Sequence, residues 1–256
     1  RMLHELSHPN VVSYHGAFYQ EGMIHIVLEC MDGTLADVLK SGPPMPEAII
    51  AEIVRETLAG LAYLHAHHTI HRDFKPSNLL LNENGQVKIT DFGVSAHLGS
   101  TMAKATSWVG TTVYMSPERV QGANYSYSSD IWSLGLTALE CCLGKFPYPP
   151  RVNASFFDLL DTIVNQPSPM PPVDAPYSAS FREFISACLE KSPETRPTAT
   201  NGLQHPFILL HQESNIKEAY LRDALQRAAA AKANSVEDQG FSEDGPVSLS
   251  GDMDFA

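Results

Sequence analysis

The chain has 256 residues, 43% of them hydrophobic and 18% charged, and a formal net charge of -12. This length is enough to bury a core without disulfides or metals, while the excess of acid argues against binding nucleic acid or an anionic membrane, since both require a basic face. No apolar run approaches the ~20 residues of a membrane-spanning helix. The four cysteines lack C-x-x-C spacing, so we expect reduced thiols and a cytoplasmic protein.

The pattern of apolar residues predicts an α+β domain that is mainly helical. Two strands are expected at the front, at 11–18 and 24–28, with Glu21 and Gly22 in the turn between them. A long helix is expected over 47–66, followed by a hairpin that pairs 79–81 with 87–89. Further helical patterns cover 129–143, 155–164 and 180–189.

Three other segments have patterns of their own. Residues 93–117 are rich in Ser and Thr and have almost no periodicity, which is typical of a functional or disordered loop. Residues 214–233 predict an amphipathic helix. Residues 235–256 contain six acids and no Lys or Arg, so half of the net charge lies there and we expect a disordered tail.

Two short motifs carry the chemistry. Residues 71–78 read H-R-D-F-K-P-S-N, and residues 91–93 read D-F-G. This is the order in which protein kinases carry their catalytic loop and their metal-binding motif. Either motif alone would be weak, but five chemical positions in order make an unrelated polar loop a remote alternative.

Phosphoryl transfer explains the residue types in these motifs. Asp73 is suited to orient the attacking hydroxyl and accept its proton, and Lys75 neutralises charge on the transferred phosphoryl group. Asn78 and Asp91 supply the hard oxygen ligands that Mg²⁺ prefers. The hairpin between them is expected to bring the two ligands together.

The resemblance to protein kinases covers about residues 1–210, and other motifs support it. The matching segments are Ser116–Glu118, Asp130 with Trp132 and Gly135, Arg196–Pro197, and His205–Phe207. The resemblance implies an ion pair between Glu118 and Arg196, and implies that Asp130 holds the backbone of the catalytic loop. Within the kinases, the strings at 16–22, 91–96 and 109–119 are similar to those of the dual-specificity mitogen-activated protein kinase kinases.

The resemblance also implies a nucleotide site for ATP with Mg²⁺. Leu28 would be the gatekeeper, the backbone of Glu29 and Met31 would meet the adenine edge, Leu80 would form the floor, and Asp37 would reach the ribose. For the segment 28–31, a plain buried strand end is the alternative interpretation.

The resemblance further implies regulation and partners. Thr101 and Ser107 are the preferred phosphorylation sites, with Ser100 and Thr106 as the alternative pair and ordinary loop hydroxyls as the simpler interpretation. The implied substrate is a MAP kinase activation loop, phosphorylated on Ser/Thr and Tyr. An upstream MAP kinase kinase kinase would dock on 214–233, although that helix could equally pack on the domain or form a dimer seam.

Several parts of the family pattern are missing ahead of Arg1. The sequence contains no G-x-G-x-x-G loop, no strand Lys for the nucleotide phosphates and no helix Glu to pair with it. We therefore expect either a kinase fragment, inactive alone, or a naturally truncated pseudokinase that acts by binding; the intact catalytic residues favour the fragment. The expected divisions are a remnant of the N-terminal lobe (1–31), the C-terminal lobe (32–210), an appended helix (211–234) and the acidic tail (235–256).

Overall fold

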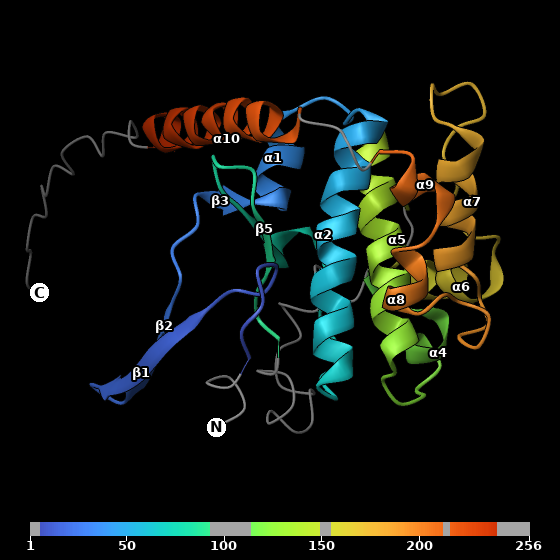
Figure 1. The fold of residues 1–256 in the computed structure, drawn as a ribbon, viewed down its shortest axis with the longest axis horizontal. Coiled ribbons are helices and arrows are strands. Elements are labelled where there is room, and N and C mark those ends of the chain that lie inside the picture. The colour runs from blue at the N-terminus through green and yellow to red at the C-terminus, as the bar shows by residue number, and fades with distance from the viewer. Residues whose placement is uncertain (1–5, 93–113, 149–154, 212–215, 240–256) are drawn as a thin grey trace, which may run out of the picture.

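A computed structural model describes residues 6–92, 114–148, 155–211 and 216–239. It has a helical body, a projecting β-hairpin and a small second sheet, which agrees with the α+β expectation (Figure 1). The strands are β1 (Tyr14–Gln20), β2 (Met23–Leu28), β3 (Gly33–Thr34), β4 (Leu79–Leu81) and β5 (Val87–Ile89). The helices are α1 (Leu35–Ser41), α2 (Glu47–Ala66), the 3₁₀ turn η2 (Pro76–Asn78), α4 (Pro117–Val120), α5 (Tyr127–Leu143), α6 (Phe156–Asn165), α7 (Ala179–Cys188), α8 (Ala199–Gly202), α9 (Pro206–Leu209) and α10 (Lys217–Gln239).

The first hairpin forms around the expected turn, but its first strand begins later than the sequence predicted. Glu21 and Gly22 have φ of 52° and 81°, as a two-residue hairpin turn requires. Val11 and Val12 do not extend β1, because they join β5 instead: Val12 N donates to Ile89 O at 2.9 Å. Both valines are therefore buried, whereas the hairpin projects away from the helical body (Figure 1).

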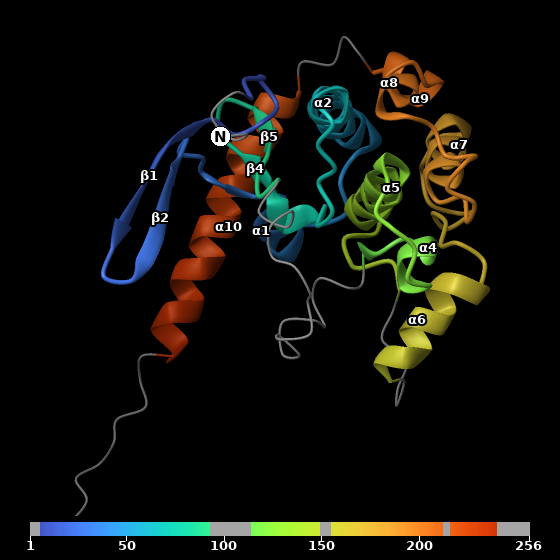
Figure 2. The same cartoon turned by 90° about the horizontal axis from the view of Figure 1, so that it is seen from below.

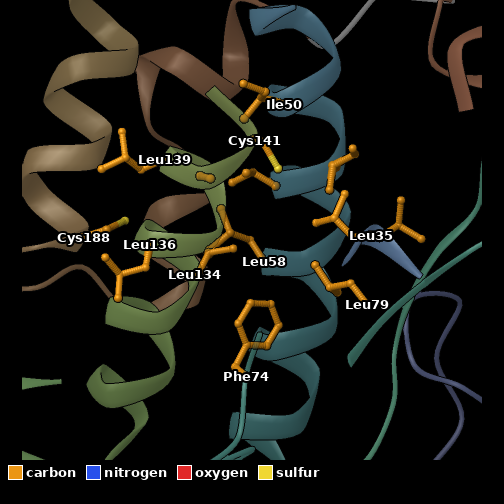
Figure 3. Close-up of a cluster of buried hydrophobic side chains, with 14 of the residues drawn as sticks. Leu35, Ile50, Leu58, Phe74, Leu79, Leu134, Leu136, Leu139, Cys141 and Cys188 are labelled. Carbon is orange, nitrogen blue, oxygen red and sulfur yellow. The ribbon is translucent and has the colours of Figure 1, made fainter. Parts of the chain in front are cut away.

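Helices α2 and α5 lie side by side and form the centre of the core (Figures 1 and 3). Leu58 from α2, Leu134 from α5 and Phe74 from the loop after α2 are each 1% exposed and face one another. Truncating a buried leucine of this kind costs about 2–5 kcal/mol. Phe74 thus anchors the segment that carries the candidate catalytic residues directly in the core.

The small sheet has the order β3-β4-β5 and is antiparallel throughout. Side chains alternate between its faces. Leu79 and Leu81 are fully buried on one face, while Leu80 lies between them on the other and is half-buried. β3 pairs Thr34 with Leu80, so the start of α1 lies beside the middle of β4.

The expected helix near the carboxyl end is present as α10, which lies across α1 (Figures 1 and 2). Leu221, Ala224, Leu225 and Ala228 recur at helical spacing and are buried against the domain. The helix continues to Gln239, so the boundary predicted at 234 is wrong by five residues. Extension of an existing helix adds one hydrogen bond per residue fixed, which the acidic composition of 235–239 does not prevent.

Candidate active site

A buried carboxylate on α5 holds the loop after α2 through hydrogen bonds to the loop backbone. Asp130 is 1% exposed, and its oxygens accept hydrogen bonds from His71 N at 2.9 Å and Arg72 N at 3.0 Å. Arg72 has φ of 73°, a left-handed conformation that costs energy for a residue with a side chain. Asp130 therefore has the backbone-holding role expected for it, and it stabilises a strained turn next to Asp73.

His65, to which the sequence interpretation gave no role, completes this arrangement. Its Nε2 lies 2.8 Å from Asp130 Oδ2 and must be the donor, because a carboxylate only accepts. Its ring also lies 4.7 Å from that of Tyr127. A histidine six positions ahead of the H-R-D motif gives no separate sequence signal, so only the structure reveals the contact.

His71 joins the loop to the end of β5. Its Nε2 is 2.9 Å from Thr90 O, and its Nδ1 accepts from Asp73 N at 3.3 Å. The ring is fully buried and meets Phe74 edge-on at 5.5 Å. The first residue of the motif thus sets the backbone direction at Asp73 and has no direct part in the chemistry.

The three predicted catalytic residues meet within hydrogen-bond distance. Lys75 Nζ donates to Asp73 Oδ2 at 2.8 Å. Asn78 Nδ2 donates to Asp73 O at 2.7 Å and lies 3.3 Å from Asp73 Oδ2. The side chain of Asp73 is 29% exposed, so a hydroxyl group of a molecule in solution can reach its carboxylate.

The hairpin brings the second predicted metal ligand back to the first. Thr90 N donates to Asn78 O at 3.0 Å, and Asp91 is the next residue. Asp91 is exposed and has φ of 61°, whereas Phe92 is buried beside it and fixes the backbone. The side-chain amide nitrogen of Asn78 bonds to Asp73, so the amide oxygen of Asn78 remains as a possible metal ligand. Asp91 offers a carboxylate. These two hard oxygen ligands fit Mg²⁺, which takes few ligands from the protein when it also binds nucleotide phosphates.

Of the residues expected at the adenine, Leu28 ends β2, Glu29 and Met31 lie between β2 and β3, and Leu80 lies in β4. Glu29 N donates to Ser13 O at 2.9 Å, which leaves its carbonyl as the group that could meet a purine edge. The Glu29 carboxylate pairs with Lys88 Nζ at 2.7 Å. Although burial favours the neutral acid, hydrogen bonds from Lys88 and Ser13 hold the pKa of Glu29 below its usual value. Leu28 and Met31 on either side are half-buried.

Asp37, expected at the ribose, has a structural role that the sequence did not reveal. Thr34 and Asp37 form a capping box at the start of α1: Asp37 N donates to Thr34 Oγ1 at 3.1 Å, and Thr34 N donates to Asp37 Oδ2 at 3.1 Å. Thr34 Oγ1 also donates to Asp37 Oδ2 at 2.8 Å. Lys232 of α10 also reaches Asp37 Oδ2, at 2.9 Å. Burial opposes ionisation, but the bonds from Lys232 and Thr34 hold the pKa of Asp37 below its usual value. Through the pairing of Thr34 with Leu80, this carboxylate lies beside the expected adenine floor.

The ion pair that the resemblance implied is also present. Arg196 Nη1 and Nη2 donate to the two oxygens of Glu118 at 2.8 and 2.7 Å, and Arg196 is 5% exposed. Burial favours the neutral acid, but the hydrogen bonds from Arg196 hold the pKa of Glu118 below its usual value. The expected phosphorylation sites, Thr101 and Ser107, lie outside the described residues.

The chain is similar to known proteins over most of its length. The model of the protein kinase domain family matches residues 1–208. The chain is 48% identical over 223 residues to mitogen-activated protein kinase kinase 1c of Physcomitrium patens, which covers 85% of this chain and 63% of the relative. Mitogen-activated protein kinase kinase 2 of Arabidopsis thaliana is also 48% identical, over 84% of this chain and 61% of the relative. The dual specificity mitogen-activated protein kinase kinase dSOR1 of Drosophila melanogaster is 42% identical, over 81% of this chain and 58% of the relative.

Each match covers a larger share of this chain than of the relative. The chain spans about three fifths of the length of these curated relatives. Among the helices that the structure describes, none has the length and apolar character needed to cross a membrane.

Proposed function

Because the chain belongs to the protein kinase family, we propose that it carries the catalytic part of an enzyme that transfers the γ-phosphoryl group of ATP to protein hydroxyls. The observation that carries this proposal is the meeting of Asp73, Lys75 and Asn78 within hydrogen-bond distance, on a loop held by Asp130. A loop that served only binding would have no need to hold a strained turn beside a solvent-accessible carboxylate.

In the proposed reaction each residue has a separate task. Asp73 orients the substrate hydroxyl and accepts its proton as the oxygen attacks phosphorus. Lys75, now paired with Asp73, neutralises charge on the transferred group. Asn78 and Asp91 would hold Mg²⁺, which would offset the negative charge of the nucleotide phosphates. The chain's own contribution is therefore positioning and charge, which is most of what phosphoryl transfer requires.

The nucleotide would occupy the space beside β2 and β4. We propose that Leu28 borders the adenine, that the backbone of Glu29 and Met31 hydrogen-bonds its edge, and that Leu80 lies beneath it. The position of Leu80 on the face opposite the buried Leu79 and Leu81 supports this assignment. Asp37 would meet the ribose only by sharing its carboxylate with Lys232 and Thr34.

The proposed substrate is a MAP kinase, since the relatives named above are MAP kinase kinases. The test is transfer of labelled phosphate from ATP by the full-length protein to a MAP kinase that lacks activity of its own, with mass spectrometry of the product. We expect Mg²⁺-dependent phosphate on Thr and Tyr of the activation loop. Asp91→Asn should raise the Mg²⁺ concentration needed for half-maximal rate. Binding of the MAP kinase without transfer would instead indicate a scaffold.

The proposed upstream contact is α10, within the range 214–233. The apolar residues Leu221, Ala224, Leu225 and Ala228 are buried on the domain, whereas Arg222, Asp223 and Gln226 are exposed. The helix can therefore pack and still present a polar face to an upstream kinase. Arg222→Glu, on that face, should weaken activation by a MAP kinase kinase kinase. If the variant is activated at the unaltered rate, α10 has only a structural role.

Activation is proposed to occur by phosphorylation of Thr101 and Ser107. Each phosphate would add about -1.5 to -2 charge and could pair with Arg72 near the catalytic loop. Mass spectrometry of the protein after incubation with an upstream kinase should find both sites modified. An activated sample without phosphate at either position would refute this proposal.

A further inference from the structure

A cavity that none of the assigned roles uses lies beside the catalytic loop. Its volume is about 530 Å³, and it is bounded by α1, the catalytic loop, Tyr114 and the end of α5. Three lysines from three separate elements line it: Lys40 in the last turn of α1, Lys75 in the catalytic loop, and Lys145 just after α5. The whole chain has 17 basic residues against 29 acidic ones, so a cavity with this lining opposes the average charge of the protein.

The single acid that lines this cavity, Glu140, is hydrogen-bonded to a tyrosine that also lines it. Tyr114 Oη donates to Glu140 Oε2 at 2.5 Å. Burial raises the pKa of Glu140, despite the opposing effect of this hydrogen bond. Glu140 Oε2 is thus held by Tyr114, whereas the side chains of Lys40 and Lys145 are exposed.

The position of the cavity relates it to the substrate. Lys75 lines the cavity and also donates to Asp73 Oδ2 at 2.8 Å, so the cavity begins one side chain away from the carboxylate assigned to the substrate hydroxyl. An extended peptide advances about 3.3 Å per residue. A residue one or two positions from the phosphorylated one would therefore place its side chain at the cavity.

We propose that this cavity is a substrate subsite that binds the carboxylate of an acidic residue next to the phosphorylated residue, through Lys40 and Lys145. The proposal rests on the proposed kinase function and adds a substrate preference to it. We infer a carboxylate ligand because the site offers two flexible ammonium groups. Ammonium groups attract a compact anion and, unlike a guanidinium, do not require a fixed hydrogen-bond geometry. Lys75 completes the positive boundary on the side of Asp73.

The test uses the full-length activated protein and peptides with one phosphorylatable residue. One series places a single Glu at each of the two positions before and after that residue, and matched series carry Gln, Lys or phosphoserine there. We expect one Glu position to raise kcat/KM over Gln by up to about fivefold per lysine contacted. Lys40→Glu and Lys145→Glu should each reduce the Glu-to-Gln ratio and shift the preference toward Lys. Gln204→Glu, which adds a negative charge at an exposed turn after α8, should leave the ratio unchanged.

A binding measurement separates this proposal from the kinase function. Fluorescence anisotropy with labelled Glu and Gln peptides should give the same preference without phosphate transfer. A Glu preference that Lys40→Glu removes, in a protein that transfers no phosphate, would support the subsite and refute the function. Transfer with equal kcat/KM for Glu and Gln peptides at every position would overturn the subsite alone. A preference confined to phosphoserine would also overturn it, because the ligand would then be a phosphate. Thermal melts show whether a charge-reversal variant is misfolded. In that case Lys40→Gln or Lys145→Gln is used instead, and we predict the same loss of the preference for Glu.

Discussion

Asp130→Asn is expected to loosen the catalytic loop in a way that can be measured without activity. The side chain of Asp130 is 2% exposed and receives hydrogen bonds from His71 N, Arg72 N and His65 Nε2. An asparagine of the same shape keeps one acceptor oxygen and places an amide N–H opposite one of these donors. Hydrogen bonds to charged groups contribute about 1.5–3 kcal/mol each, and a buried donor without a partner costs about 1–3 kcal/mol. The free energy of unfolding should therefore fall by about 2–4 kcal/mol.

Two measurements on the whole chain test this expectation. Urea unfolding gives the loss in stability, and hydrogen exchange at residues 71 and 72 reports whether their amides remain protected. Asp161→Asn, which alters an exposed carboxylate on α6, is the matched control and should change the stability by no more than about 0.5 kcal/mol. A loss below about 1 kcal/mol for Asp130→Asn, with both amides still protected, would refute the role assigned to Asp130.

Two other substitutions follow from buried contacts. Arg196→Met should cost about 3–5 kcal/mol by leaving Glu118 buried without its partner, as urea unfolding would show. Because the pKa of Glu118 is lowered in the folded state, the contribution of Glu118 to stability should be complete above the ordinary Glu pKa of about 4.3. This contribution should be lost as the pH falls through the folded pKa. Arg196→Met should remove this pH dependence, and an unchanged acid transition in the variant would contradict the expectation. Gly33→Ala places a Cβ 2.8 Å from Leu225 Cδ2 and should speed hydrogen exchange in α10, whereas Gly16→Ala, with open space around it, should not.

The sequence predicted best the parts whose signal is local. The long apolar period over 47–66 and the turn at 82–85 define α2 and the β4–β5 hairpin with the observed bounds. The H-R-D and D-F-G motifs can be recognised from neighbours along the chain, and the structure brings Lys75 and Asn78 within hydrogen-bond distance of Asp73. These features depend on neighbours along the chain, which a sequence displays directly.

Features that depend on distant segments could not be predicted in the same way. Val11 has the strand propensity of β1, but a pairing with Ile89, far along the chain, removes it from the hairpin. The capping box of α1 was missed because Asp37 was assigned to a ligand, and its contact with Lys232 joins segments 195 positions apart (232 − 37). His65 likewise acquires a role only because α5 places Asp130 against it.

The most direct test of the central claim is the rate of phosphate transfer by the full-length protein with Asp73→Ala. We propose Asp73 as the carboxylate that receives the substrate proton, so we predict that kcat falls by at least about 100-fold, with nucleotide binding retained. The Asp161→Asn variant should transfer phosphate at the unaltered rate. If Asp73→Ala retains full activity, the catalytic role derived from this geometry is contradicted.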